Sequence, residues 1–215
     1  MIKSIRSQFE RQLQETQNDV LRMGALVEKS CWLAHQALFY RDLSAVDELQ
    51  RHDQNVDLYY RNIEMNCLRL MALQSPVAND LRFISTLMQL VRDLERIGDY
   101  AEELGDVALK LLPYPPPPYL DELERMSSIC STMLAMSLEA LTDLDVDSGR
   151  RMILKDDEVD ACYSRVYDSL AHQTNIQGSV EPLLLGTLAI RALERMADHA
   201  TNIGTRIAFI VTGQR

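Results

Sequence analysis

The stretch Leu87–Leu111, LMQLVRDLERIGDYAEELGDVALKL, decides the fold of this 215-residue chain. Its apolar residues recur at alternating steps of three and four: Leu87, Leu90, Leu94, Ile97, Ala101, Leu104, Ala108 and Leu111. A stretch near the C-terminus repeats this spacing with Gly186, Ala189, Leu193, Met196, Ala200, Ile203, Ile207 and Ile210. Such spacing is typical of long amphipathic helices that pack at shallow angles in bundles. The sequence therefore predicts an all-α protein.

The two stretches are copies of one another. At an offset of 99 residues, RDLERIGDYA at 92–101 aligns with RALERMADHA at 191–200. At an offset of 103, DQNVD at 53–57 aligns with DDEVD at 156–160. This duplication indicates a tandem repeat of a three-helix unit. We expect two three-helix bundles, with six helices over about 3–40, 44–74, 76–111, 119–144, 147–174 and 180–212.

Prolines mark the boundaries between these units. Five of the seven prolines lie between Pro113 and Pro118, a stretch that cannot be helical and that we interpret as a stiff linker. The linker at 113–118 divides the chain into a first bundle at 1–112 and a second bundle at 119–215. Ser75-Pro76 is typical of a helix start, with the serine as cap and the proline in the first helical position.

Charge and motif content exclude several classes of protein. The formal net charge of −10 repels phosphate backbones, so we expect no nucleic-acid partner. No window approaches the roughly 18 uncharged apolar residues of a membrane span, so we expect a cytoplasmic protein. The chain has no C-x-x-C pair, no P-loop, no G-x-S-x-G motif and no E-x-x-H motif of di-iron bundles. These absences give no support to nucleotide hydrolysis, acyl transfer or a di-iron site, and we assign no catalytic residue.

Paired carboxylates recur at matching positions of the two repeats. In each repeat the middle helix carries D-x-x-x-D and the last helix E-x-x-x-D, which places each pair on one helix face. The eight residues are Asp53, Asp57, Glu95 and Asp99 in the first repeat and Asp156, Asp160, Glu194 and Asp198 in the second. Both first-repeat pairs lie about 30 Å from the turn of their helical hairpin, and both second-repeat pairs about 23 Å. Within each repeat, the two pairs should therefore face each other.

Four carboxylates at one level repel one another unless positive charge lies between them. Bound metal is one source, because oxygen ligands suit Mg, Ca and Mn, and carboxylate clusters also take Fe or Zn. Arginines of the same motifs are a second source, namely Arg92, Arg96, Arg191 and Arg195. A catalytic acid–base pair is a third interpretation of the carboxylates. The carboxylates do not belong to the series of apolar residues at steps of three and four, which we call the apolar seam of each helix. We therefore expect the site on the flank of the bundle rather than in its core.

Three motifs resemble the PhoU family of phosphate-signalling regulators: P-V-A-x-D-L-R at 76–82, L-E-R-I-G-D at 94–99 and L-E-R-M-A-D-H-A-T-N-I at 193–203. The resemblance implies multinuclear metal clusters of Fe, Zn, Mn or Mg held by the E/D-x-x-x-D motifs, and no established catalytic activity. It also implies a negative regulator of phosphate uptake and phosphate-starvation signalling, which links a phosphate ABC transporter ATPase to a phosphate sensor histidine kinase. On this basis we expect a homodimer that reaches the inner membrane only through its partners.

The two repeats differ at positions that bear on the metal sites. The first repeat has Tyr100 and Glu103 where the second has His199 and Asn202, the residues that the family pattern favours. His199 and Asn202 are therefore further candidate ligands in the second cluster. We expect the two clusters to differ in ligands, metal or occupancy.

Partner binding and catalysis are the two functions left to compare. Asp80 and Arg82 of the A-x-D-L-R motif lie a few residues from the turn and far from the clusters, where a partner could reach them. The second repeat has no counterpart of this motif, so such a partner contact would be one-sided. The other interpretation of Asp80 is an acid in the first helical turn, favoured by the helix dipole. The alternative function is a carboxylate-bridged multinuclear metalloenzyme, either a hydrolase or a redox enzyme. We favour the regulatory adaptor, because a site on the flank offers no evident apolar pocket for a substrate.

Overall fold

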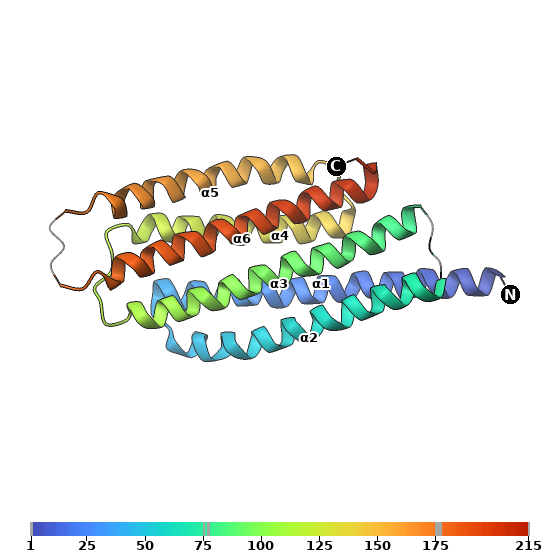
Figure 1. Ribbon diagram of the computed structural model, residues 1–215, viewed down its shortest axis with the longest axis horizontal. Coiled ribbons are helices and arrows are strands. Elements are labelled where there is room, and N and C mark those ends of the chain that lie inside the picture. Colours follow the sequence, from blue (N-terminus) through green and yellow to red (C-terminus); the bar gives the residue numbers. More distant parts are fainter. Residues whose placement is uncertain (1, 75, 77, 175–177, 215) are drawn as a thin grey trace.

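The computed structural model describes residues 2–74, 76, 78–174 and 178–214, and within these ranges all regular structure is helical. The six helices are α1 (Ile2–Tyr40), α2 (Leu43–Gln74), α3 (Asn79–Leu111), α4 (Leu120–Asp143), α5 (Ser148–Ala171) and α6 (Glu181–Thr212). Helices α1–α3 form one bundle and α4–α6 the other, and the two lie side by side along a common long axis (Figure 1). The predicted all-α tandem repeat of two three-helix bundles is confirmed. In this part of the chain no helix has both the length and the apolar composition to cross a membrane.

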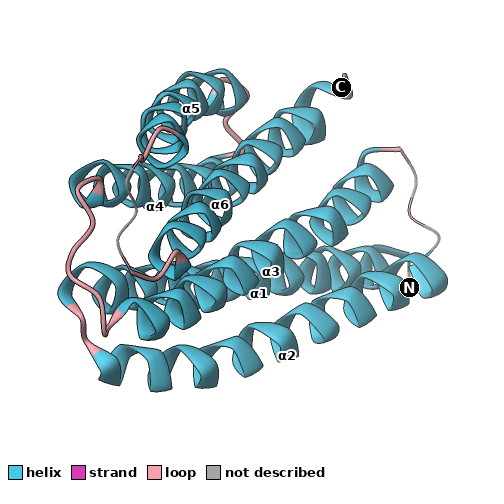
Figure 2. Ribbon diagram, turned by 60° about the vertical axis from the view of Figure 1, so that its left-hand side comes forward, coloured by secondary structure: helices cyan, strands magenta, loops and turns pink. Residues whose placement is uncertain are grey.

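The two bundles share one hydrophobic core. Helix α3 contacts α6 extensively, α1 contacts α4 to a lesser extent, and α2 and α5 lie on the outer sides of the molecule (Figures 1 and 2). Every residue of the apolar seam predicted for α6 is buried. The same holds for the apolar seam predicted for α3, except that Leu111 is only partly buried against the same core. Helices α3 and α6 run in opposite directions, so the apolar faces of the two repeats pack against each other in an antiparallel arrangement (Figure 1).

One helix start differs from the prediction. Helix α3 begins at Asn79, so Pro76 lies outside it, while Ser75 falls outside the described residues. Ala78 has a positive φ of 46°, a conformation that cannot continue a right-handed helix, and α3 begins directly after it. Helix α6 has a proline in its first turn, Pro182, and the Glu181 N–H donates to Ser179 Oγ over 3.1 Å at its start.

The linker is fixed to helix ends of both bundles. Arg41, just after α1, donates from Nη2 to the Tyr114 carbonyl oxygen over 2.7 Å, and the Tyr114 hydroxyl donates to Glu181 at the start of α6 over 2.6 Å. Tyr119 is buried beside Gly186 of α6. These contacts tie the linker to α6 as well as to the end of α1.

Candidate functional site

The first carboxylate group lies on facing flanks of α2 and α3. Asp53 and Asp57 of α2 and Glu95 and Asp99 of α3 are all half-buried. Burial raises the pKa of Asp53, and the negative charges of Asp57 and Asp99 raise it further. Burial also raises the pKa of Glu95, and the charge of Asp99 adds to this effect. The structure therefore brings the two pairs within electrostatic reach of one another.

Glu102 adds a fifth carboxylate to this group. Its pKa is raised by burial first, and then by the charges of Asp53, Asp106, Asp99 and Asp57. Glu102 lies outside the repeated carboxylate motifs that predicted the other four. The sequence could have predicted it from the spacing, because Glu102 follows Asp99 by three positions and therefore lies on the same helix face.

Arginines neutralise part of the charge in the first group. Arg96 Nη1 lies 2.8 Å from Asp99 Oδ2, and Arg61 forms an ion pair with Asp57 one turn away on α2. Arg61 was not among the arginines that the motifs suggested. Arginine pairing, one of the alternatives raised by the sequence, is thus present here.

The second carboxylate group lies on α5 and α6. Burial is the main cause that raises the pKa of Asp156 to about 6, and the charges of Asp160 and Asp198 contribute. Glu194 is half-buried, and its pKa is raised by burial and by Asp198. Asp160 is exposed at the edge of the group.

Arginines also reach the second group, with poorer geometry. Arg195 Nη1 lies 3.3 Å from Asp198 Oδ2, and Arg191 Nη1 lies 3.4 Å from Glu194 Oε2. Glu194 Oε2 is nevertheless a buried oxygen that accepts no hydrogen bond from the described residues. Arg195 Nε lies 3.7 Å from the same oxygen, so two guanidinium groups supply positive charge to Glu194 without an aligned hydrogen bond.

The fit of these groups to a metal ion follows from their donors and their geometry. The donors are carboxylate oxygens, the ligands that hard divalent cations prefer, and they include Glu194 Oε2, which accepts no hydrogen bond from the described residues. Across the described ranges, however, no three His, Cys, Asp or Glu side chains are arranged so that they could hold a metal ion as they stand. Metal binding would therefore require these side chains to rotate toward one another and the arginines to move aside.

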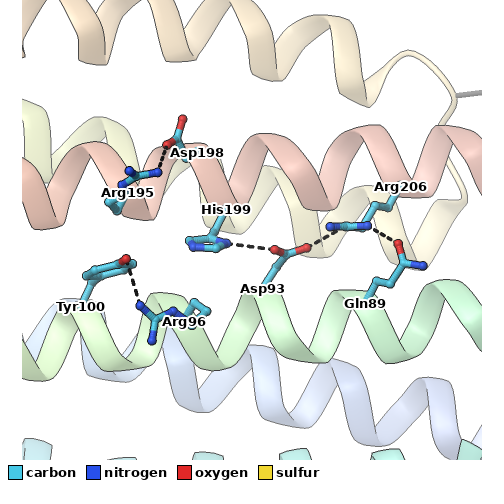
Figure 3. A network of polar contacts seen from close by, with 8 residues as sticks. All are labelled: Gln89, Asp93, Arg96, Tyr100, Arg195, Asp198, His199 and Arg206. Atoms are coloured by element: carbon cyan, nitrogen blue, oxygen red, sulfur yellow. Dashed lines mark hydrogen bonds and ion pairs between the residues drawn. The ribbon is translucent and has the colours of Figure 1, made fainter.

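His199 takes part in a contact between the bundles instead of joining the second carboxylate group. Its Nδ1 lies 2.9 Å from Asp93 Oδ1 of α3, and its ring stacks on Tyr100 with 6.0 Å between centroids (Figure 3). Asp93 is only 5% exposed. Its second oxygen accepts a 2.7 Å hydrogen bond from Arg206 Nε, and Arg206 also binds Gln89 (Figure 3). These side chains form a polar network that links α3 to α6.

Asp93 and Arg206 were not among the site residues predicted from the sequence. The alignment of the two repeats could have pointed to both residues. Asp93 aligns with Ala192 of the second repeat, and Arg206 aligns with Val107 of the first. Ala192 and Val107 are both buried. A charged residue opposite a buried apolar one in a duplicated helix indicates a contact that only one repeat makes.

The remaining candidates occupy separate surroundings. Asn202 is exposed and lines a shallow hollow between α3 and α6. Asp80 Oδ2 lies 3.7 Å from Arg6 Nη2 of α1, whereas Arg82 donates to Asn79 and lies over the Phe209 ring at the end of α6. Asp80 and Arg82 therefore contact different helices and do not form a pair.

Comparisons with known proteins identify the relatives of this chain. The model of the PhoU domain matches residues 20–108 and again 123–207. The "phosphate-specific transport system accessory protein PhoU homolog" of Synechocystis sp. is 52% identical over 210 residues, which cover 98% of this chain and 94% of that protein. The accessory protein PhoU of Escherichia coli is 29% identical over 213 residues, which cover 99% of this chain and 88% of that protein.

Solved structures give the same result. The crystal structure of PhoU from Pseudomonas aeruginosa superposes with a TM-score of 0.92 at 30% identity, and the match covers 96% of this chain and all of that one. A phosphate transport system regulatory protein PhoU from Streptococcus pneumoniae gives a TM-score of 0.88 at 28% identity, with 96% and 98% covered. These names describe accessory and regulatory proteins, so the metalloenzyme alternative gains no support. The chain belongs to the PhoU domain family.

Proposed function

We propose that this protein is a regulatory accessory protein of a phosphate-specific transport system and acts by binding protein partners. The observation that carries the proposal is the 52% identity, over 98% of the chain, to an accessory protein of such a system. Two helical bundles with charged outer flanks suit an adaptor, because charged helix surfaces can bind protein partners. The finer parts of the proposal are negative regulation of phosphate uptake, contact with the transporter ATPase and contact with a phosphate sensor histidine kinase. We also propose a homodimer in the cytoplasm that reaches the inner membrane through these partners.

Deletion of the gene in the host tests the regulatory role. We expect phosphate-starvation genes to stay on in phosphate-rich medium, because a negative regulator is missing. A chromosomal reporter measures this expression, and a plasmid copy of the wild-type gene should restore repression. Unchanged reporter expression in the deletion strain, with the transporter and kinase intact, would contradict the proposal.

The two carboxylate groups supply the second part of the proposal, which is metal binding. Asp53, Asp57, Glu95 and Asp99 would hold one cluster, while Asp156, Asp160, Glu194 and Asp198 would hold the other. Bound divalent cations would neutralise the facing carboxylates and connect the middle and last helices of each bundle. Two observations support this: the raised pKa values in both groups and the unsatisfied oxygen of Glu194.

Paired variants test each cluster separately. Glu95→Gln with Asp99→Asn should remove the metal of the first group, and Glu194→Gln with Asp198→Asn should remove that of the second. The measurement is metal per chain by mass spectrometry after a chelator challenge. Asp121→Asn with Glu139→Gln is the matched control, because it makes the same change in charge at exposed acids of α4. Equal metal content in the parent and both paired variants would rule out the clusters.

A further inference from the structure

On the side of the molecule formed by α1 and α4, the two bundles contact each other at several places and leave a hollow between two of these contacts. At one point a Cβ atom on Gly24 of α1 would lie 2.3 Å from Leu138 Cδ2 of α4, so the helices are close together. At the other point His35 Nδ1 lies 3.0 Å from Ser127 Oγ. The eleven positions from Gly24 to His35 correspond to about 16 Å of helix. The hollow, which we call the Trp32 groove, has a volume of about 380 Å³ and is lined by Glu28, Cys31, Trp32, His35, Ser128, Ser131 and Leu134.

One wall of the Trp32 groove is an exposed aromatic ring. Trp32 is the only tryptophan of the chain and is 49% exposed. The ammonium group of Lys29 lies 3.8 Å from the centroid of its ring, which holds the ring in place without covering it fully. An ordered and half-exposed tryptophan beside a hollow is typical of an anchor at a protein interface.

The other wall, formed by α4, consists of small and apolar side chains. The Ser128 hydroxyl donates to the Glu124 carbonyl oxygen, and the Ser131 hydroxyl donates to the Ser127 carbonyl oxygen. Both hydroxyls are therefore satisfied by their own helix, and α4 presents small side chains to the groove. Buried Leu134 contributes an apolar surface to the same lining. A bulky apolar side chain of a partner could enter here without leaving a polar group unpaired.

Carboxylates lie at the groove and at one of its ends. Glu28 is exposed, partial burial by its neighbours raises its pKa, and none of the described Lys, Arg or His side chains forms an ion pair with it. Glu124 Oε1 lies 3.7 Å from His35 Nε2 and accepts a hydrogen bond from Tyr40. Glu28 is the carboxylate among the residues that line the groove, so the lining attracts a cationic group of a partner and disfavours an acidic one.

We propose that the Trp32 groove is the docking site for a cationic amphipathic segment of a partner protein, whose bulky apolar side chain inserts beside Trp32 and whose Lys or Arg pairs with Glu28. The partner that fits the proposed function is a component of the phosphate transporter, and only this identification rests on that function. The groove itself rests on the hollow, the exposed ring and the unpaired carboxylate.

Selection of short random peptides on the full-length protein, with Trp32→Ala as the counter-selection target, tests the groove without assuming any partner. We expect enriched peptides that place Leu, Phe or Trp next to Lys or Arg. In the wild-type protein, binding of the enriched peptides that lack tryptophan should shift the emission of Trp32, because the protein's single tryptophan lies at the groove. Anisotropy of labelled peptides then measures the affinity of each variant.

The variants separate a groove from general attraction to an acidic surface. Affinity should fall by about tenfold or more in Trp32→Ala and severalfold in Glu28→Gln. Ser131→Leu should also weaken binding, because it fills the groove and leaves both Trp32 and the charge in place. Tyr167→Ala is the matched control, since Tyr167 of α5 is likewise 49% exposed. Circular dichroism of each variant checks that it is folded, and two of the three groove variants must weaken binding for the proposal to stand.

Several outcomes would overturn the proposal. These are the absence of any Trp32-dependent peptide, enrichment of neutral or acidic sequences, and equal losses in Tyr167→Ala and Trp32→Ala. A dimer in sedimentation that Trp32→Ala dissociates would assign the groove to a second copy of the chain instead.

Co-purification with the transporter ATPase separates this inference from the proposed function. If the wild-type protein and the three groove variants bind the transporter equally, the groove proposal fails and the function stands. If selected peptides bind the groove but the wild-type protein does not bind the transporter, the function fails and the groove stands.

Discussion

Asp93 is a carboxylate in the interface between two repeats, held by His199 on one side and Arg206 on the other. Removal of a buried charge leaves its partners without an acceptor, which costs about 3–5 kcal/mol for a fully buried pair. His199 and Arg206 are partly exposed, so water recovers some of this loss. We expect Asp93→Ala to lower the free energy of unfolding by about 2 kcal/mol in urea denaturation. Asp157→Ala, at an exposed position, should change it by less than about 0.5 kcal/mol.

A second substitution at the same contact checks that the pair, and not the fold in general, is responsible. The first repeat already has Val107 at the position of Arg206, and the second has Ala192 at that of Asp93. Asp93→Ala combined with Arg206→Val should therefore be more stable than the sum of the single effects, by about 1–2 kcal/mol. Strict additivity in this cycle would show that the two side chains are not coupled.

Asp156 gives a prediction about pH. Its pKa rises from 3.8 to about 6 in the folded protein, mainly because of burial and then because of Asp160 and Asp198. Between these values the folded state holds more protons than the unfolded state, so the free energy of unfolding falls as pH rises through this window. Above it, ionised Asp156 destabilises the fold.

The corresponding variant is Asp156→Asn. Without metal, it should be more stable than the parent at pH 7 by up to about 1 kcal/mol, because solvent screens this half-buried group. At pH 4 the two proteins should unfold at nearly the same temperature. Thermal denaturation in chelator at both pH values measures the difference, and an equal gain at pH 4 and pH 7 would assign it to something other than titration.

At the scale of the helices, close approaches between elements decide which glycines can be replaced. A Cβ on Gly186 of α6 would lie 2.2 Å from the hydroxyl oxygen of buried Tyr119, whereas a Cβ on Gly98 of α3 would meet Val56 at an ordinary 3.5 Å. Gly186→Ala should therefore destabilise by about 1–2 kcal/mol. Gly98→Ala should stabilise by about 0.5–1 kcal/mol, because alanine loses less backbone entropy in a helix. Thermal midpoints that move in opposite directions would support this assignment, and a gain at both positions would show that Tyr119 moves freely.

At the scale of the whole molecule, the shared core predicts that the two bundles unfold together. Buried residues of all six helices belong to one cluster, and α3 packs on α6 across the boundary between the repeats. Trp32 emission follows the first bundle, while far-ultraviolet circular dichroism follows both. We expect the two signals to give coincident urea transitions. A fluorescence transition that precedes or follows the dichroism transition would show that the bundles unfold independently.

The sequence by itself determined the six helices, their grouping into two repeats and the facing carboxylate pairs. The reason is that these features depend on short-range regularities. Helical periodicity records which face of each helix is buried, and the length from a hairpin turn sets which residues lie at one level. The start of α3 was the exception, because the positive φ of Ala78 has no signal in a stretch where Pro76 already suggests a helix start.

Only the tertiary structure decided how the repeats meet. Periodicity does not encode that α3 lies antiparallel against α6, so it could not place His199 beside Asp93 or bring Arg206 to the same carboxylate, more than a hundred positions away. For the same reason it could not show that α1 and α4 separate around Trp32 and leave a groove there. Contacts between distant segments depend on the docking of whole helix faces, and the energy of that docking is the sum of many packing contacts that no local pattern of residues records.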